Sequence, residues 1–195
     1  MKPPDEKVQA SDALVNKHVE PVPWNVRSNE AFHRLREVWN KRQKIPKLLN
    51  LDDGKPIEAG LQHIRMMLGG DESAGGIQVC YDLLDPGVVV PPHYQPYEDE
   101  LFFVVDGEIE VTVGTETKIL RKGGFGYAPR NTTHAFRNAT DKPASMFTLN
   151  TPAGHERGFQ AAERILKRGG SLTEIMAELG KHDFIFHDDN LDLGG

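Results

Sequence analysis

The chain has 195 residues, with 23 Lys and Arg against 29 Asp and Glu, for a formal net charge of -6. Because an acidic chain has no basic excess to neutralise phosphates, we expect neither nucleic acid nor a membrane as a partner. One cysteine cannot form an internal disulfide, no apolar run reaches the ~20 residues of a membrane helix, and the amino terminus lacks a signal-peptide pattern, so a cytoplasmic protein is expected.

Residues 1–60 are expected to form an arm followed by one helix. Residues 1 to about 27 are polar and rich in proline, without hydrophobic periodicity, which predicts an arm without a core of its own. From Asn29 onward apolar residues recur at helical spacing, which predicts an amphipathic helix that ends before Pro46. The apolar residues of this helix are Phe32, Leu35, Val38 and Trp39.

Residues 61–151 are expected to form a β-barrel. Short β-favouring runs such as GIQVCYDLL, ELFFVV, EIEVTV and ASMFTLN alternate with turn signals such as DPG, DG and KGG. Asp106-Gly107 predicts a tight hairpin with a positive φ. Strands joined by tight turns predict an all-β fold, an antiparallel double-sheet barrel.

Residues 152–195 are expected to add helices. Glu156 to Arg168 has a helical apolar face and stops at two glycines, and Ser171 to Glu174 has the pattern of a capping box that opens a second helix. The tail HDFIFH can add an edge strand. We expect these elements to cover the barrel or to complete a homodimer.

Two polar clusters concentrate the chemistry of the chain. His93 and Gln95 are two residues apart and therefore project from one face of an extended segment, and Glu100 opens the next predicted strand. In the second cluster a turn at Pro129 and Asn131 delivers His134 to the start of a strand. These side chains can converge on one point inside the barrel.

At these residues the chain resembles the cupin superfamily. The residues that match the two spaced cupin motifs are Gly87, His93, Glu100 and Gly107, and then Gly123, Pro129, His134 and Asn138. Two positions depart from the motifs, since Gln95 replaces the second histidine and Asn131 replaces a glycine. The second departure is mild because asparagine also tolerates positive φ. The wider run from Met67 to Glu156 is similar to single-domain, quercetin 2,3-dioxygenase-like cupins.

The resemblance implies a divalent metal, either Fe, Mn, Ni or Zn, with His93, Gln95, Glu100 and His134 as candidate ligands. Two histidines and one carboxylate are typical of non-haem Fe(II) oxygen chemistry. Gln95 either ligates the metal weakly or through water, which we favour, or donates a hydrogen bond to a substrate oxygen. Gln95→His should tighten metal binding if this side chain faces the metal.

Other polar residues receive a structural interpretation. Glu98 lacks the family spacing, and Asp99 should point away from the face of Glu100. Cys80 is interpreted as a small buried strand residue. Surface or hydrogen-bonded roles are expected for the histidines outside the motifs, His18, His33, His155, His182 and His187.

Several strand residues are expected to fill the interior or to line a substrate cavity. Those interpreted as interior are Met66, Phe102, Phe125, Tyr127, Phe136 and Phe147. Of these, Phe102, Tyr127 and Phe136 are candidate substrate-binding residues. His63 can hydrogen-bond a substrate or a ligand, although a structural role is favoured.

The resemblance leads to three functional hypotheses. The first is a metal-dependent dioxygenase that acts with O2 on a small aromatic or oxygenated organic substrate, with Glu100 doubling as a base. The second is a redox-neutral lyase, cyclase or isomerase in which the metal only polarises a carbonyl. The third is a non-catalytic cupin that binds a small molecule.

Overall fold

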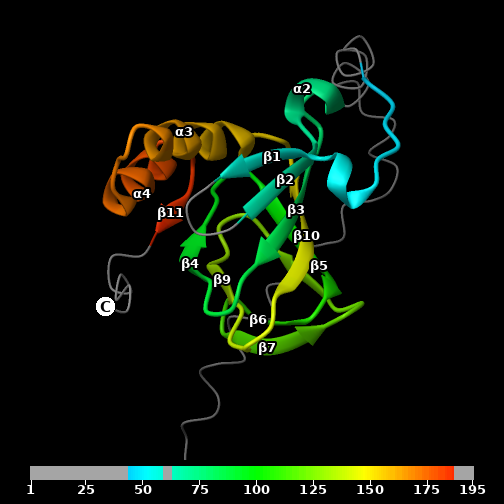
Figure 1. Cartoon of the computed structure of the whole chain (residues 1–195). Helices are drawn as coiled ribbons and strands as arrows, with labels where there is room; N and C mark the ends of the chain where they lie inside the picture. The colour runs from blue at the N-terminus through cyan, green and yellow to red at the C-terminus, as the bar shows by residue number, and fades with distance from the viewer. Residues whose placement is uncertain (1–43, 59–62, 187–195) are drawn as a thin grey trace, which may run out of the picture. The chain divides into compact units, whose positions relative to one another are not determined.

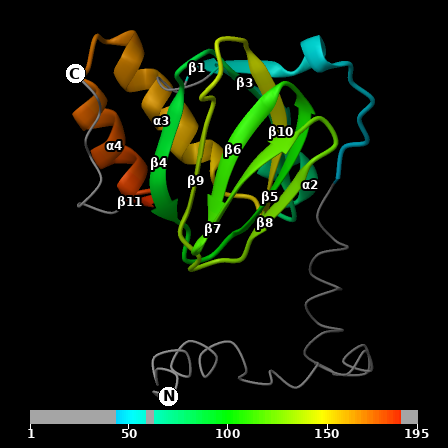
Figure 2. The ribbon, with the colours of Figure 1, turned by 90° about the horizontal axis from the view of Figure 1, so that it is seen from below.

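Two antiparallel sheets make up most of the computed structural model, which describes residues 44–58 and 63–186 (Figure 1). The six-stranded sheet runs β1 (Lys55–Glu58), β2 (His63–Leu68), β3 (Gln78–Leu84), β10 (Ala144–Thr151), β5 (Asp99–Asp106) and β8 (Phe125–Ala128). The five-stranded sheet runs β11 (Ile185–Phe186), β4 (Val89–Tyr94), β9 (His134–Arg137), β6 (Glu108–Val113) and β7 (Glu116–Arg121). The predicted antiparallel double-sheet architecture is confirmed (Figure 2).

The core lies between the two sheets. Alternate residues of each strand point inward, so Phe102 and Val104 of β5 meet Ile109 and Val111 of β6. Met146 of β10 packs into the same cluster. Toward one end of the barrel the inward positions change from apolar to polar, because Glu100 precedes Phe102 on the same face of β5.

The inward face of β8 differs from the sequence prediction. Phe125 and Tyr127 were expected in the interior, but they are 58% and 47% exposed. The small residues Gly126 and Ala128 face inward instead, and a Cβ on Gly126 would lie 3.1 Å from Phe102 Cδ2. Phe102 already fills the space beneath β8, so the large aromatic side chains of this strand must face outward.

The tight turn with positive φ predicted at Asp106 and Gly107 is present, but the predicted hairpin is not, because β5 and β6 belong to different sheets and do not pair with each other. Gly107 has φ +76° and joins β5 to β6. A Cβ on this residue would lie 2.8 Å from Ala144 Cβ, so both the backbone angle and the close approach of β10 require glycine.

Two helices cover one side of the barrel (Figures 1 and 2). Helices α3 (Glu156–Lys167) and α4 (Leu172–Gly180) pack on each other, and α3 also packs on β1. The predicted capping box is present, since Ser171 Oγ accepts from Glu174 N at 3.2 Å and Ser171 N donates to Glu174 Oε2 at 3.0 Å. The tail forms the predicted edge strand, because β11 pairs with β4.

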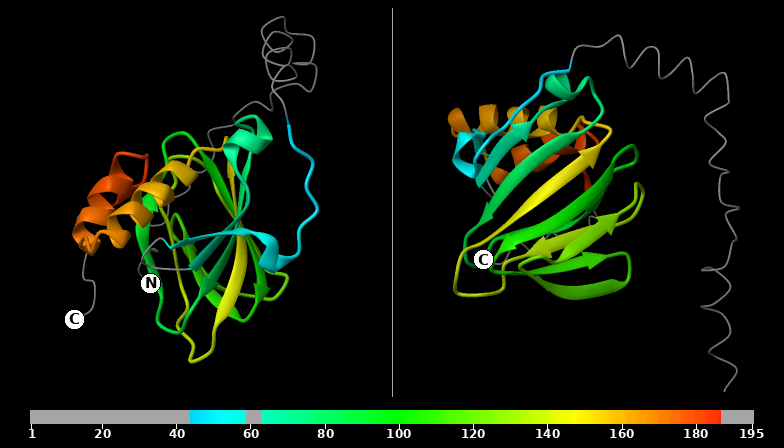
Figure 3. Two further views of the ribbon diagram at one scale, coloured as in Figure 1. Left: turned by 45° about the horizontal axis from the view of Figure 1, so that its top comes forward. Right: turned by 90° about the vertical axis from the view of Figure 1, so that its right-hand side faces the viewer.

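The remaining elements precede the barrel or connect its strands. They are the 3-10 turn η2 (Leu51–Asp53) and the short helix α2 (Gly70–Ser73). The arm and nearly all of the helix expected before Pro46 lie outside the described residues. Strand β1 begins before residue 61, where the barrel was expected to start, and extends the six-stranded sheet through pairing with β2 (Figure 3). Among the described residues, no helix is long and apolar enough to cross a membrane.

Candidate metal centre

Three buried side chains from both sheets meet at one end of the barrel. His93 of β4 and His134 of β9 are cross-strand neighbours in the five-stranded sheet, and Glu100 of β5 faces them from the other sheet. One nitrogen of each histidine and one oxygen of Glu100 all lie within 4.8 Å of one another. The structure therefore brings His93 and Glu100 of the first motif together with His134 of the second motif, as expected.

Backbone carbonyls orient both imidazole rings. The Nδ1 atom of His93 lies 2.9 Å from Pro91 O, and the Nδ1 atom of His134 lies 2.9 Å from Thr132 O. Because a carbonyl accepts a hydrogen bond, Nδ1 of each ring carries the proton. In the neutral rings the lone pair is then on Nε2, which is the arrangement that metal-binding histidines use.

The charges of the three groups are coupled. Burial alone would raise the pKa of Glu100, but the hydrogen bond and positive charge of His134 lower it to about 2. Burial opposes the charging of His134, and its contact with Glu100, 3.2 Å between Nε2 and Oε2, nevertheless raises the pKa of this histidine. Burial and then the charge of His134 lower the pKa of His93 to about 3. Glu100 and His134 thus favour each other's charged form, and a metal ion bound here would take the place of a proton on His134.

Gln95 contacts the carboxylate of the cluster. The residue is 1% exposed, and its Nε2 donates a hydrogen bond to Glu100 Oε2 at 3.0 Å. The sequence left open whether Gln95 is a ligand or a substrate donor, and the contact in the structure is a third role, that of holding the candidate ligand Glu100. The backbone of Gln95 also accepts from Asn131 N at 2.8 Å, which ties together the turns of the two motifs.

Asn131 has the conformation that the family glycine would have. Its φ is +63°, and Thr132 N donates to Pro129 O at 3.0 Å across the same turn. The prediction that asparagine serves here in place of glycine is confirmed, and the turn leads directly into His134.

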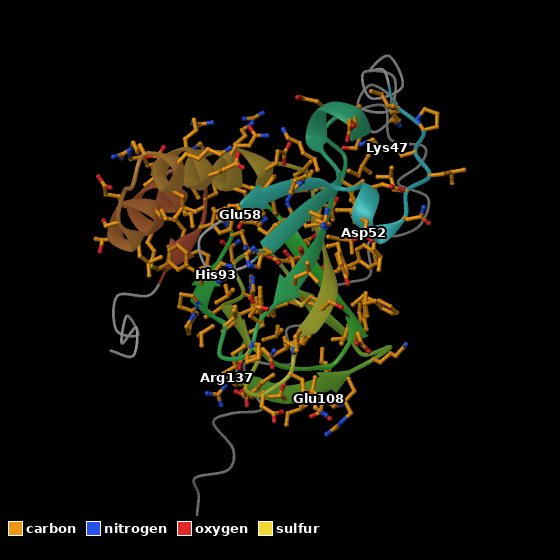
Figure 4. The ribbon with its side chains drawn as sticks, viewed as in Figure 1. Lys47, Asp52, Glu58, His93, Glu108 and Arg137 are labelled. Carbon is orange, nitrogen blue, oxygen red and sulfur yellow. The ribbon has the colours of Figure 1, made fainter. Side chains whose placement is uncertain are left out.

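A small cavity of about 50 Å³ opens beside the cluster. His93, Glu100 and His155 provide its charged or titratable lining, and the rest is Val90, Phe136, Thr148, Phe159, Leu179, Phe184 and Phe186. Figure 4 labels His93 on β4, on the side of the barrel where β11 and the two helices lie. The cavity is therefore walled partly by the barrel and partly by the C-terminal segment.

Of the four residues predicted to bind a substrate, Phe136 lies at the cavity and Phe102 does not. Phe136 lines the cavity, as expected. Phe102 is fully buried and packs against His134, with 5.6 Å between ring centroids, but it does not line the cavity. Phe102 therefore packs against a candidate ligand and lies outside the cavity.

His63 and Tyr127, the other two members of that set, lie away from the cavity. The side chain of His63 is 58% exposed, and its Nδ1 lies 2.9 Å from Glu58 Oε2 on the neighbouring strand. His63 starts β2 on the far side of β3, so it does not reach the barrel interior. Tyr127 faces outward because Phe102 fills the space beneath β8. His63 therefore has the structural role that was favoured, whereas Tyr127 lines a separate pocket with Glu116, Lys118 and Phe125, where its substrate-binding role stays a prediction.

The acidic neighbours of Glu100 have separate surroundings. Asp99 points away and binds the guanidinium of Arg130, with Oδ1 2.9 Å from Nε, as expected. Glu98 is 7% exposed, and burial raises the pKa of its carboxyl. Glu98 does not belong to the cluster of ligand atoms.

Sequence reasoning missed two buried groups near the cavity. A surface or hydrogen-bonded role was expected for His155, but it is 1% exposed, neither ring nitrogen has a hydrogen-bond partner among the described residues, and it lines the cavity. Asp82 of β3 is 1% exposed and accepts a hydrogen bond from Thr148 Oγ1 at 2.6 Å. Burial raises the pKa of Asp82 to about 7. The only sequence indication for His155 was its place in the run after the last barrel strand that is similar to the cupin family.

Comparisons with known proteins identify the segment that carries the cluster. Residues 81–150 match the family model described as the cupin domain. Polyketide synthase CurC of Streptomyces cyaneus is 38% identical over 64 residues, which are 33% of this chain and 42% of that protein. Protein SchB of Streptomyces halstedii is 34% identical over 61 residues, which are 31% of this chain and 44% of that protein. The chain thus spans less than half the length of these two curated relatives.

The fold is also found among solved structures. An RmlC-like cupin from Shewanella frigidimarina NCIMB 400 matches with a TM-score of 0.50 and 16% identity, over 59% of this chain and 98% of that chain. At this identity the likeness concerns the fold alone. The family match and the shared fold together support a cupin domain at residues 81–150 of this chain.

Proposed function

We propose that this chain, with its cupin domain at residues 81–150, is a metal-dependent enzyme of dioxygenase type that acts on a small aromatic or oxygenated organic substrate. The observation that carries the proposal is the buried set of two imidazoles and one carboxylate, which opens onto a cavity walled largely by aromatic rings. Two histidines with one carboxylate leave coordination positions open on the metal, as non-haem Fe(II) oxygenases require.

The residues fit a divalent metal. Both Nδ1 atoms are fixed by carbonyls, so two Nε2 lone pairs and one negative carboxylate face the same point. His93, His134 and Glu100 would hold the ion. When bound, it would act as a Lewis acid for a substrate oxygen and provide a site for O2.

The protein groups supply position and a dry environment. Gln95 holds Glu100 through its amide, which leaves the carboxylate with one fixed orientation. Because its carboxylate oxygen belongs to the cluster and is held by Gln95, we assign Glu100 the role of ligand, and its second role as a base stays a prediction. Phe136, Phe184 and Phe186 give the cavity apolar walls beside His93 and Glu100.

The size of the cavity limits how a substrate enters. Its volume of about 50 Å³ accommodates a few water molecules or O2. Sites for organic ligands usually measure ~300–1,000 Å³. An aromatic substrate therefore requires the C-terminal residues Phe184 and Phe186 to move aside before it reaches the metal.

A redox-neutral reaction on a polyketide-type substrate is the second candidate. The relative from Streptomyces cyaneus is described as a polyketide synthase, and it is similar over 64 residues of this chain. Poly-carbonyl compounds offer enolisable oxygens to a Lewis acid, and a cyclisation or isomerisation of such a compound needs no O2.

Oxygen consumption separates the two candidates. Protein loaded with Fe(II) is mixed with quercetin or with catechol, and O2 uptake is followed with an electrode. We expect uptake that disappears in His93→Ala and persists in His63→Ala, a matched change at an exposed histidine. Product formation at an unchanged rate without O2 would select the redox-neutral reaction, and full activity of metal-free protein would contradict both.

A further inference from the structure

His155 is a buried histidine without a hydrogen-bond partner. It lies at the start of α3 and is 1% exposed. Neither Nδ1 nor Nε2 has a hydrogen-bond partner among the residues that the structure describes. Native proteins rarely leave such groups unpaired, because each removes a polar atom from water without compensation. A buried ring with two unpaired nitrogens beside a cavity therefore points to a partner that enters the cavity.

Aromatic rings fix the position of His155. The imidazole stacks on Phe184 with 4.3 Å between centroids and an interplanar angle of 29°, and Phe159 lies 6.2 Å away. Phe184 also stacks on His93 at 5.9 Å. His155 is thus held next to the metal cluster but on the C-terminal side of the cavity, with Phe184 against both imidazoles.

His155 does not belong to the metal cluster itself. The three ligand atoms that lie within 4.8 Å of one another come from His93, Glu100 and His134. Burial lowers the pKa of His155 to about 4, so at neutral pH its ring is uncharged and offers one N–H donor and one acceptor nitrogen. Those are the groups needed for a hydroxyl or carbonyl oxygen.

We infer that His155 is a substrate-binding residue, which forms a hydrogen bond with an oxygen of the substrate while a second substrate oxygen meets the metal. This inference rests on the proposed function. The site then selects flat molecules that carry two neighbouring oxygens, such as a hydroxy-carbonyl compound or an aromatic diol. The hydrogen bond to His155 orients the molecule, and Phe136 and Phe159 of the cavity wall contact its apolar faces.

Three variants test this role. His155→Phe keeps an aromatic ring of similar size but removes both nitrogens, and His155→Gln keeps a donor and an acceptor. His63→Phe is the matched control, because that side chain is 58% exposed and lies outside the cavity. The probes are Mn²⁺ alone and then acetohydroxamate, a small chelator with two neighbouring oxygens, both measured by titration calorimetry on the full chain.

Wild type and His155→Phe should bind Mn²⁺ with the same affinity, within about threefold. Loss of one hydrogen bond in a dry site should weaken acetohydroxamate binding by about 5- to 100-fold in His155→Phe. His155→Gln should recover part of this loss, and His63→Phe should behave as wild type. The melting temperature of His155→Phe should rise, because a buried polar group without a partner has been removed.

Two results would overturn the inference. Weaker Mn²⁺ binding in His155→Phe would make the residue a ligand, and equal affinity of wild type and His155→Phe for acetohydroxamate, weak or strong, would show that it does not contact the bound molecule. Wild-type protein that binds no Mn²⁺ would instead contradict the proposed function, and with it the inference.

Discussion

Glu100 is the residue on which the candidate centre depends. Its Oε2 receives hydrogen bonds from Gln95 at 3.0 Å and from His134 at 3.2 Å, one from each cupin motif. The glutamine at position 95 is thus a specific partner of the carboxylate. Groups that orient a ligand in this way commonly change metal affinity by ~10- to 100-fold when they are removed.

Substitutions at position 95 should change metal affinity in opposite directions. Gln95→Leu, which is similar in size but cannot donate, should weaken Mn²⁺ binding by about 10- to 100-fold because Glu100 loses its fixed orientation. Gln95→His should tighten binding, since it places a third imidazole beside the carboxylate. Titration calorimetry measures both. Unchanged affinity in both variants would show that the contact with Glu100 has no part in the centre.

Asp82 should make stability depend on pH. Its pKa is raised from 3.8 to about 7 in the folded chain, so the folded state holds the proton more tightly than the unfolded state. The stabilisation is complete below pH 3.8 and is lost as the pH rises to 7, by at most about 1.4 kcal/mol per pH unit. Asp82→Asn retains an acceptor for Thr148 and should remove this loss.

The measurement is the free energy of unfolding in urea between pH 4 and 7, with EDTA present. Asp82→Asn and wild type should be similar near pH 4, and the variant should be more stable at pH 7. Asp85→Asn, at an exposed position of the same segment, is the control and should follow wild type. Parallel curves for wild type and Asp82→Asn would contradict the raised pKa.

Among single residues, the sequence predicted the candidate ligands His93, Glu100 and His134 better than it predicted the residues that line the cavity. His93, Glu100 and His134 were identifiable because strand periodicity and motif spacing are local properties of the chain. His155 was not, because its burial depends on a helix that returns over the end of the barrel. Tyr127 was placed inside because alternation alone does not say which of two faces is inward, and the packing of Phe102 over Gly126 decides that.

At the scale of elements, the turns were the most predictable features. A positive φ at Gly107 and Asn131, and the side-chain cap at Ser171, depend only on residues that are close in the sequence. Strand β1 was missed because Lys55–Glu58 is short, mostly exposed and contains a proline, so its pairing with β2 depends on tertiary contacts.

Two glycines with positive φ should respond differently to substitution. Gly107 has φ +76° and Gly123 has φ +82°, so alanine at either position costs ~1–2 kcal/mol of backbone strain. At Gly107 the new Cβ would also lie 2.8 Å from Ala144 Cβ, whereas at Gly123 no described atom lies within 4 Å. Gly107→Ala should therefore be more destabilising than Gly123→Ala by a further ~1–3 kcal/mol.

Urea unfolding of the two variants measures this difference. Equal free energies of unfolding would mean that β10 adjusts freely to the added methyl group. The close packing of β5, β6 and β10 at the Gly107 turn would then not be required for the barrel.

At the scale of the whole molecule, the barrel and the C-terminal segment share one cavity. The barrel provides His93, Glu100 and Phe136, and the segment after β10 provides His155 and Phe184, among others. Access for an organic substrate is therefore coupled to the packing of α3, α4 and β11. The expected homodimer stays a prediction, for which Phe103 and its strand partner Phe125 provide exposed apolar surface.

The stoichiometry of metal binding tests the proposed metal centre most directly. Purified, metal-free protein is titrated with Mn²⁺, and free Mn²⁺ is measured by electron paramagnetic resonance. Wild type should bind one equivalent per chain, and His93→Ala, His134→Ala and Glu100→Gln should each bind none at the same concentration, while His63→Ala binds as wild type. Wild-type protein that binds no more Mn²⁺ than these three variants would contradict the metal centre at His93, Glu100 and His134.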